Sequence, residues 1–281
     1  MRPVKRLLRS VGTRVLAFAS RAYVPGPHLS DAMRWARRMD ARGIAVTLGY
    51  FNADGERPSS VAAHDRTAIE MLDMLSRKGY VSFKVPSLHY DEALLTSMAL
   101  EAERRGQIVH FDSHGPETAQ STVDALGMLV RPGRQLSLTV PARWARSRAD
   151  VEWAVARGLR VRVVKGQWEC PEEPGRDLRE CYMDIIQRLA GRGLPVAVAT
   201  HDAPLAAQAL RLLKDKGTDC ELELLCGLPR REVIAVARQL DVPVRLYIPF
   251  GEAWLPYALD QAVRSPRMLW WMVRDTFNAM R

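Results

Sequence analysis

The chain has 281 residues, of which 47% are hydrophobic and 26% charged, a composition typical of a folded globular protein with a sizeable core. It excludes a collagen-like, low-complexity or disulfide-stapled chain, because the Gly and Pro residues show no repeat and there are only four Cys. The net charge of +9 favours an anionic partner without choosing among nucleic acid, a membrane surface and an acidic protein.

Much of the positive charge lies at the N-terminus, where six Lys and Arg precede the first acidic residue, Asp31. The apolar stretch 15–19 is too short for the core of a signal peptide, so residues 1–42 are predicted to form a helical segment. No stretch approaches the roughly 18 apolar residues of a membrane-spanning helix, and the cysteine spacing suits free thiols in a reducing compartment. We therefore expect a cytoplasmic protein that at most lies peripherally on the inner face of a membrane.

Eight short runs rich in Val, Ile and Leu follow in chain order and predict strands at 43–50, 80–85, 107–111, 135–140, 159–164, 194–199, 220–225 and 242–248. Segments with helical spacing of apolar residues lie between them, at 65–78, 92–105, 148–157, 177–192, 204–216 and 230–240. Eight strands alternating with helices in about 250 residues are typical of a (β/α)8 TIM barrel, an α/β fold. The barrel is predicted over 43–281, with C-terminal helices covering it, and a doubly wound open sheet is the alternative.

In such a barrel the chemistry lies where the strands end. Polar residues gather at those positions, among them Lys84, Asp112, Lys165, Thr200 with His201, and Tyr247. Glu221 and Glu223 also belong to this group. The pattern predicts a site at the C-terminal ends of the strands.

The sequence resembles the proline dehydrogenase family of flavoenzymes through nearly its whole length. The stretches that carry the resemblance are RAYVPG at 21–26, VSFKVPSLH at 81–89, VRVVKGQWE at 161–169, VATHDAP at 198–204, ELELLCGLP at 221–229 and VRLYIPFGEAWLPY at 244–257. The resemblance implies a distorted (β/α)8 barrel that holds FAD. It also implies removal of hydride from the carbon next to a ring nitrogen, which gives an imine, and transfer of the electrons to a membrane quinone or another acceptor.

The resemblance implies roles for individual residues. Lys84 and Asp112 match an acid and base pair near the substrate, and Tyr247 matches a tyrosine beside the substrate ring. Arg162 matches the arginine beside the reactive nitrogen of the flavin, where a positive charge favours the reduced anion. The cofactor side is implied at Arg162, Val164, Lys165, Gly166, Thr200, His201 and Glu223.

The sequence departs from the family at the positions where the family binds the substrate carboxylate. After Tyr257 the family has two adjacent arginines, but this chain has Asp260 and Gln261, and Arg264 stands where the family has a glutamate. Losing one partner of a buried charged pair costs about 2–5 kcal/mol, so free L-proline is predicted to bind poorly. A small cyclic amine or a proline derivative with a masked carboxylate is the substrate expected at Tyr257, Asp260, Gln261 and Arg264.

The cofactor side departs from the family as well. Pro141 and Glu223 stand where the family has glutamines, and proline has no hydrogen to donate. A non-catalytic member of the family is therefore an alternative to an enzyme.

A metal-dependent barrel hydrolase is a third reading, because His110, Asp112 and His114 alternate along one strand end, and would share a face if the strand extends that far, while His201 and Asp202 close another strand. The resemblance accounts for Asp112 and His201 without a metal, and no metal site is predicted. No nucleic-acid partner is expected, since the chain has no recognised binding module.

Overall fold

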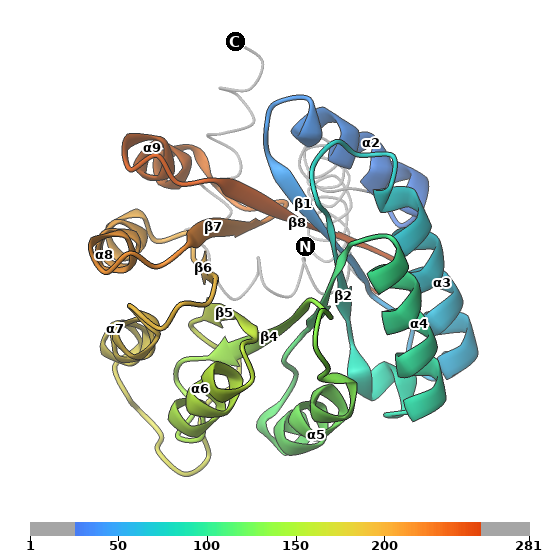
Figure 1. The fold of residues 1–281 in the computed structure, drawn as a ribbon, viewed down its shortest axis with the longest axis horizontal. Helices are drawn as coiled ribbons and strands as arrows, with labels where there is room; N and C mark the ends of the chain where they lie inside the picture. Colours follow the sequence, from blue (N-terminus) through green and yellow to red (C-terminus); the bar gives the residue numbers. More distant parts are fainter. Residues whose placement is uncertain (1–25, 254–281) are drawn as a thin grey trace, which may run out of the picture.

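Eight parallel strands close into a barrel in the computed structural model, which describes residues 26–253; each strand pairs with its neighbours in chain order, and β8 pairs with β1 (Figure 1). The strands are β1 Ala45–Tyr50, β2 Tyr80–Phe83, β3 Ile108–Phe111, β4 Leu136–Pro141, β5 Arg160–Val164, β6 Val196–Ala199, β7 Cys220–Leu225 and β8 Val244–Phe250. The α-helices are α2 Leu29–Asp40, α3 Pro58–Leu72, α4 Glu92–Arg104, α5 Ala119–Leu129, α6 Ser147–Ala156, α7 Leu178–Leu189, α8 Ala203–Asp215 and α9 Arg231–Gln239. Two short 3-10 helices, η1 Val85–Leu88 and η2 Pro116–Thr118, follow β2 and β3.

The predicted (β/α)8 barrel is confirmed, and the alternative of an open doubly wound sheet is wrong because β1 and β8 are hydrogen-bonded neighbours. All eight predicted strands are present, with bounds that differ by at most two residues. The helix predicted at 65–78 is wrong in its bounds, since α3 spans Pro58–Leu72. Pro58 occupies the first turn, where its missing N–H costs nothing and its fixed φ favours a helix start.

The predicted domain boundaries concern segments that are described only in part. Within the predicted N-terminal helical segment 1–42, the structure has α2 at Leu29–Asp40, and residues 1–25 lie outside the described part. The C-terminal helices predicted to cover the barrel fall on 254–281, which also lie outside it.

Aspartates fix the starts of several helices. The Asp91 carboxylate accepts from the Leu94 N–H at 2.9 Å, and Asp177 accepts from the N–H groups of Arg179 and Glu180 at 2.8 and 2.9 Å. These bonds satisfy N–H groups that have no partner inside a helix. They set where α4 and α7 begin, and therefore where the loops above the barrel end.

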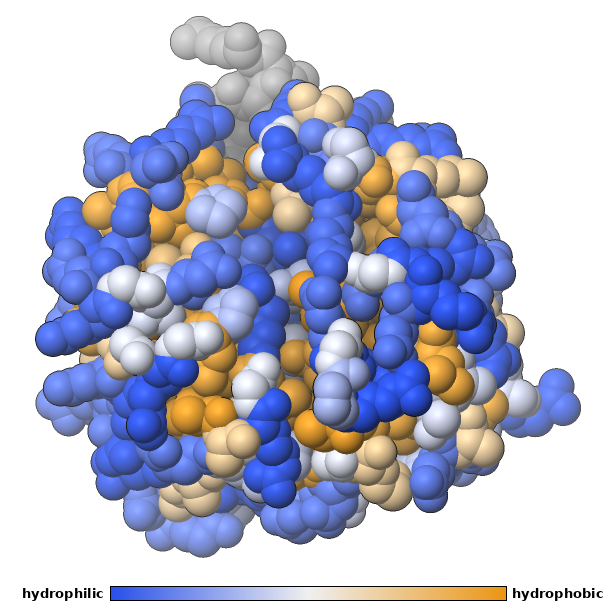
Figure 2. All heavy atoms as spheres, viewed as in Figure 1, coloured by the Kyte–Doolittle hydropathy of each residue, from blue (hydrophilic) through white to orange (hydrophobic). Residues whose placement is uncertain are grey.

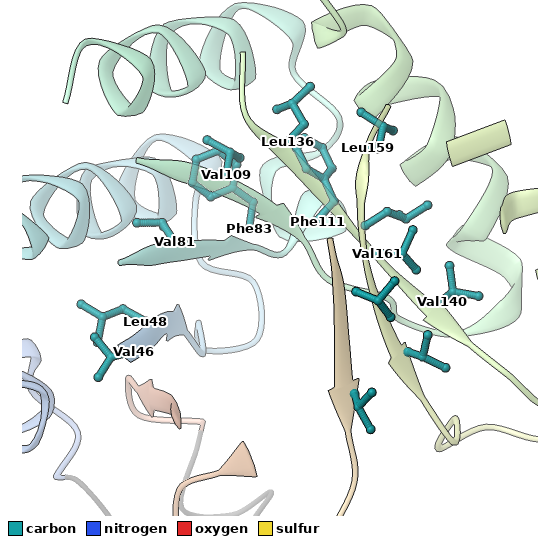
Figure 3. Packing of buried hydrophobic residues seen from close by; sticks show 14 of the residues in the cluster. Val46, Leu48, Val81, Phe83, Val109, Phe111, Leu136, Val140, Leu159 and Val161 are labelled. Atoms are coloured by element: carbon teal, nitrogen blue, oxygen red, sulfur yellow. The ribbon is translucent and has the colours of Figure 1, made fainter. Parts of the chain in front are cut away.

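The apolar core lies between the strands and the surrounding helices. Alternate residues of the strands point to this layer, as Figure 3 shows for Val46, Leu48, Val81, Phe83, Val109, Phe111, Leu136, Val140 and Val161, all at most 3% exposed. The residues between them point into the barrel. That interior carries polar side chains. Some of their hydrogen bonds join strands that are not neighbours, such as the bond from Thr47 in β1 to Glu223 in β7.

One end of the barrel interior is filled by an ion cluster at the N-terminal ends of the strands. Glu221 Oε1 accepts from Arg160 at 2.7 Å and from Arg245 Nε at 2.8 Å, and the Arg245 guanidinium lies 3.6 Å from the centre of the Tyr80 ring. Glu221 was predicted to lie at the functional end, which is wrong. It comes second in β7, about 7 Å before Glu223 at the usual rise per residue, so it faces the opposite end of the barrel.

In residues 26–253, none of the helices has the length and apolar character needed to span a membrane.

Candidate active site

A cavity of about 510 Å³ opens at the C-terminal ends of the strands, within the range of small-molecule sites. Nine residues predicted from the sequence line it: Lys84, Asp112, Arg162, Val164, Gly166, Thr200, His201, Glu223 and Tyr247. They come from β5, β7, β8 and the residues that follow β2, β3, β5 and β6. The structure therefore brings together side chains that lie up to 163 residues apart.

Asp112 is the centre of the cluster. It accepts from Ser82 Oγ at 2.8 Å and from Tyr247 Oη at 3.0 Å, and it is ion-paired with Arg162. Burial would raise the pKa of this carboxyl, but the charges of Arg162 and Lys84 outweigh it and hold the pKa well below its usual range. Asp112 is therefore an ionised carboxylate over the whole physiological pH range.

Lys84 lies between Asp112 and an aromatic face. Its ammonium is 3.8 Å from Asp112 Oδ2, 3.3 Å from Tyr247 Oη and 3.6 Å from the centre of the Phe51 ring. Lys84 is only 8% exposed, and this burial lowers its pKa although Asp112 and Asp65 oppose the effect. The amine is easier to deprotonate than a surface lysine, as a proton acceptor requires.

Gly49 makes room for Tyr247. A Cβ atom at Gly49 would lie 2.0 Å from Tyr247 Oη and 2.5 Å from Cζ. The hydroxyl can reach Asp112 across the barrel only because β1 has no side chain at this point.

Arg162 is held by two carboxylates. Its Nη1 is 3.1 Å from Glu223 Oε1, its other terminal nitrogen bonds Asp112, and its Nε donates to Thr139 Oγ1 at 3.0 Å. Glu223 Oε1 also accepts from Thr47 Oγ1 at 3.0 Å, whereas the buried Glu223 Oε2 has no partner among the described residues. The guanidinium is thus fixed in position, and its positive charge is largely neutralised by its neighbours.

The three cofactor residues predicted at the end of β5 do not all face the cavity. Val164 and Gly166 line the cavity, but Lys165 points away from it and its Nζ binds Asp202 Oδ2 at 3.0 Å. Asp202 also binds Arg179 and caps α8 through the Leu205 N–H at 3.1 Å. A cofactor contact of Lys165 therefore stays a prediction.

His201 joins two loops beside the cavity. Its Nδ1 lies 2.7 Å from the Pro229 carbonyl, and its Nε2 accepts from the Leu225 N–H at 3.0 Å. Because Nε2 accepts, the proton of the neutral ring is on Nδ1. Burial lowers the pKa of His201 to about 4.

The side chains named for the metal reading do not form a metal site. His110 is fully buried and bonds Ser137 and Thr139 instead, and residues 26–253 contain no group of three His, Cys, Asp or Glu placed to hold a metal ion. The geometry gives the hydrolase alternative no support.

Several residues of the cavity were missed by sequence reasoning, among them Phe51, Asn52 and Thr139. Thr139 lies opposite Arg162 in the β4–β5 register, so strand pairing and alternation could have found it. Phe51 and Asn52 directly follow β1, as Lys84 follows β2, so the same rule for strand ends could have found them. Trp168, in the stretch 161–169 that carries the family resemblance, also lines the cavity and is 41% exposed. Pro141 closes β4 and contributes its carbonyl to Ser147 at 2.6 Å, but its side chain does not line the cavity.

The predicted substrate-binding residues Tyr257, Asp260, Gln261 and Arg264 lie outside the described residues. The face seen in Figure 2 is mostly hydrophilic, with apolar side chains visible between polar ones toward its middle.

No family model matches the chain, but individual proteins do. It is 23% identical over 282 residues to proline dehydrogenase 2 of Bacillus subtilis, which covers 94% of this chain and 91% of that protein. It is 22% identical to proline dehydrogenase 1 of the same bacterium, over 93% of this chain and 90% of that protein. The proline dehydrogenase of Deinococcus radiodurans is 22% identical over 87% of the chain.

Solved structures of proline utilization A proteins share the fold. The protein from Bdellovibrio bacteriovorus, inactivated by N-propargylglycine, superposes with a TM-score of 0.76 at 14% identity over 88% of this chain. The protein from Corynebacterium freiburgense gives a TM-score of 0.69 at 15% identity over 96% of the chain. This chain spans 32% and 35% of those two longer chains, so the likeness establishes the barrel.

Proposed function

We infer that this chain is a FAD-dependent oxidoreductase of the proline dehydrogenase type, and we propose that it oxidises a proline-like cyclic amine to the imine. One observation carries the proposal. The residues that the family resemblance assigns to the reaction, Lys84, Asp112, Arg162 and Tyr247, meet in one hydrogen-bonded cluster at the functional end of the barrel. The similarity to proline dehydrogenases along 94% of the chain supports the same conclusion.

The residues of the cavity suit FAD. Glu223 Oε2 and His114 Nε2 are buried polar atoms beside the cavity without a partner among the described residues, and a flavin ring carries both N–H and carbonyl groups. Arg162, Val164, Gly166, Thr200, His201 and Glu223 would hold it. When bound, FAD supplies the acceptor for the hydride.

Lys84 and Asp112 have different proposed roles in removing the substrate proton. A cyclic amine must lose its ammonium proton before hydride can leave the adjacent carbon, because the nitrogen lone pair forms the new C=N bond. Lys84 Nζ, whose pKa is lowered by burial, is the proposed proton acceptor. Asp112 stays ionised and orients the Lys84 amine and the Tyr247 hydroxyl.

The substrate is proposed to lack a free carboxylate. Neither basic side chain of the described cavity is left to pair with a carboxylate, since Arg162 binds Asp112 and Glu223, and Lys84, 3.8 Å from Asp112, is the proposed proton acceptor. The tail positions that the family uses for the carboxylate carry Asp260 and Gln261. An ester, an amide or a plain cyclic amine suits this arrangement better than L-proline.

The visible spectrum of the purified full chain tests the enzyme and its substrate together. We expect a yellow protein that L-prolinamide or pyrrolidine bleaches without oxygen at least tenfold faster than L-proline at equal concentration. Equal or faster bleaching by L-proline would overturn the substrate proposal while leaving the enzyme class intact. A yellow protein that no cyclic amine bleaches would favour the non-catalytic alternative, and a colourless one would contradict FAD binding.

We also propose that the electrons pass to a quinone or another acceptor. Mixing the amine-reduced protein with a soluble quinone should restore the oxidised spectrum faster than mixing it with buffer, and an equal rate would contradict this acceptor.

A further inference from the structure

Three buried hydroxyl and imidazole side chains form a column in the barrel interior that ends beside Asp112 and Arg162. They are His110 in β3 and Ser137 and Thr139 in β4, which are 0%, 1% and 4% exposed. His110 precedes Asp112 by two residues and therefore shares its inward face. The register sets His110 opposite Ser137 and Thr139 opposite Arg162, so the column connects two strands to the catalytic ion pair.

The hydrogen bonds of the column can be assigned by counting protons. An arginine has only donors, so Thr139 Oγ1 accepts from Arg162 Nε at 3.0 Å. The single hydroxyl proton of Thr139 can go to His110 Nε2 at 2.6 Å or to Asp112 Oδ1 at 3.4 Å. The shorter separation assigns it to His110, because hydrogen bonds weaken beyond about 3.2 Å.

This assignment fixes the tautomer of His110. If Nε2 accepts, the proton of the neutral ring is on Nδ1, which then donates to Ser137 Oγ at 2.8 Å. In a doubly protonated ring, Nε2 would also carry a proton and would donate to the Thr139 hydroxyl. That hydroxyl already accepts from Arg162, and its own proton could then no longer go to His110.

The surrounding charges keep the ring neutral. Burial lowers the pKa of His110 well below its usual range, and the nearby Arg162 lowers it further. Asp112 opposes this, while Arg160 and Arg245 from the ion cluster below act in the same direction as Arg162. The groups facing the ring from β3, β5 and β8 therefore leave it uncharged at neutral pH.

We propose that His110 is a positioning residue for the proposed oxidation: as the neutral Nδ1–H tautomer, it turns the Thr139 hydroxyl so that Thr139 accepts from Arg162 Nε. The Arg162 guanidinium is then fixed by three separate groups, Thr139 at Nε and the carboxylates of Asp112 and Glu223 at its terminal nitrogens. The role in catalysis rests on the proposed function, whereas the tautomer is a property of the folded chain alone.

Nitrogen NMR of the full chain labelled in histidine tests the tautomer without any substrate. The His110 signals, assigned by their loss in His110→Gln, should show a protonated Nδ1 and an unprotonated Nε2, unchanged between pH 8 and pH 5.5. A proton on Nε2, or titration of the ring in this range, would overturn the proposal. Because turnover is not measured, the result is independent of the enzyme class.

Two variants of Thr139 test the effect on the reaction. Thr139→Val removes the hydroxyl and keeps the shape, and we expect the rate of flavin reduction by a cyclic amine to fall at least tenfold with KM changed less than threefold. Thr139→Ser keeps the hydroxyl and should recover the rate to within threefold. Thr122→Val, a buried threonine of α5 whose hydroxyl donates to the Thr118 carbonyl at 2.9 Å and which lies outside the cavity lining, is the matched control for stability.

The outcomes separate the two proposals. A wild-type rate in folded Thr139→Val, while the wild type itself is reduced by an amine, contradicts the positioning role but not the function. Thr139→Val should also move the His110 Nε2 signal, because that nitrogen loses its donor, and an unmoved signal would contradict the bond itself. If Thr139→Val does not fold, the wild-type tautomer still decides the inference.

Discussion

At the scale of single residues, the site is decided by how charges are shared. Arg162 is ion-paired with two carboxylates. Asp112 also accepts from Tyr247 and lies beside Lys84, whereas Glu223 has Thr47 as its one other hydrogen-bond partner within residues 26–253. A fully buried ion pair contributes little net stability but fixes geometry. The two carboxylates therefore have different consequences, and Glu223 is the one that can be changed without dismantling the cluster.

Glu223→Gln is predicted to raise the midpoint potential of the bound flavin. The change removes a negative charge near Arg162 and keeps an oxygen for Thr47, so more of the arginine charge is available to stabilise the reduced ring. A shift of about 30 mV or more, equivalent to about 1.4 kcal/mol for a two-electron couple, should appear in an anaerobic dye titration. Glu169→Gln, whose carboxylate is 72% exposed beside Arg143, is the control, and an unchanged or lowered potential in Glu223→Gln would contradict this reading.

Gly49→Ala is predicted to lower kcat/KM for the amine at least tenfold. The new methyl group would occupy the place of the Tyr247 hydroxyl, 2.0 Å away, so the phenol must turn and lose its bonds to Asp112 and Lys84. Steady-state kinetics of Gly49→Ala, Tyr247→Phe and the double variant check this.

The double variant should be no slower than the slower single one, because both changes remove the same hydroxyl contacts. Additive losses would mean that Gly49 acts on something other than Tyr247.

At the scale of the elements, the loops that follow the strands hold the site together. His201, after β6, binds the carbonyl of Pro229 and the N–H of Leu225 at the end of β7. This joins two neighbouring loops through a neutral ring whose pKa is lowered to about 4. Since an unfolded histidine has a pKa near 6.5, the folded state binds fewer protons between these values.

The chain is therefore predicted to lose stability as the pH falls from about 6.5 to about 4. Between these values the unfolded state binds more protons, so the free energy of unfolding decreases with falling pH, by at most about 2 kcal/mol for His201 between pH 6.5 and 5. His114, whose pKa burial also lowers to about 4, adds to the effect. Urea unfolding at pH 7 and pH 5 measures it.

His201→Gln is the matched variant, because an amide can donate to Pro229 and accept from Leu225 without titrating. It should reduce the difference in midpoint between the two pH values. A pH dependence equal to that of the wild type would contradict the assignment to His201.

Strand positions were predictable because each strand is a short apolar run between helical segments, and the barrel followed from their number. The residues of the site were predictable where a polar side chain directly follows a strand, as at Lys84 after β2 and Asp112 after β3. The contacts between residues of different strands across the barrel interior were not predictable. No spacing along the chain relates Thr47 to Glu223 or Gly49 to Tyr247, since these pairs depend on the closure of β1 onto β8 and on the stagger of the strands.

The position of a residue along the barrel axis was also not predictable from the sequence. Glu221 and Glu223 differ by two positions and share one face of β7, yet Glu221 binds Arg160 and Arg245 at the closed end while Glu223 meets Arg162 at the site. Polar residues two apart on the inward face of a strand look alike in the sequence. Which of them faces the cavity depends on where the strand begins and ends, and those bounds must be known to within one residue.

At the scale of the whole molecule, the charge is unevenly distributed along the chain. Residues 26–253 hold 31 Lys and Arg against 30 Asp and Glu, so the barrel is close to neutral. Residues 1–25 hold six Lys and Arg and no acidic residue. Most of the net charge of +9 therefore comes from the N-terminal segment, and a charge of this kind attracts a chain to anionic lipid surfaces.

The full chain is predicted to bind vesicles that contain anionic lipid, and to be released by salt. Each Lys or Arg near an anionic surface contributes about 1 kcal/mol, so changing Arg2, Lys5, Arg6 and Arg9 to Gln should weaken binding at least tenfold in a sedimentation assay. The matched control changes four exposed arginines in and just after α2, Arg34, Arg37, Arg38 and Arg42, to Gln. Both variants lose the same charge, so equal weakening would assign the effect to net charge, and no weakening in the first would contradict a role for the N-terminal segment. Loss of binding in the first variant alone would localise the attraction to the end of the chain and would fit an electron acceptor that resides in a membrane.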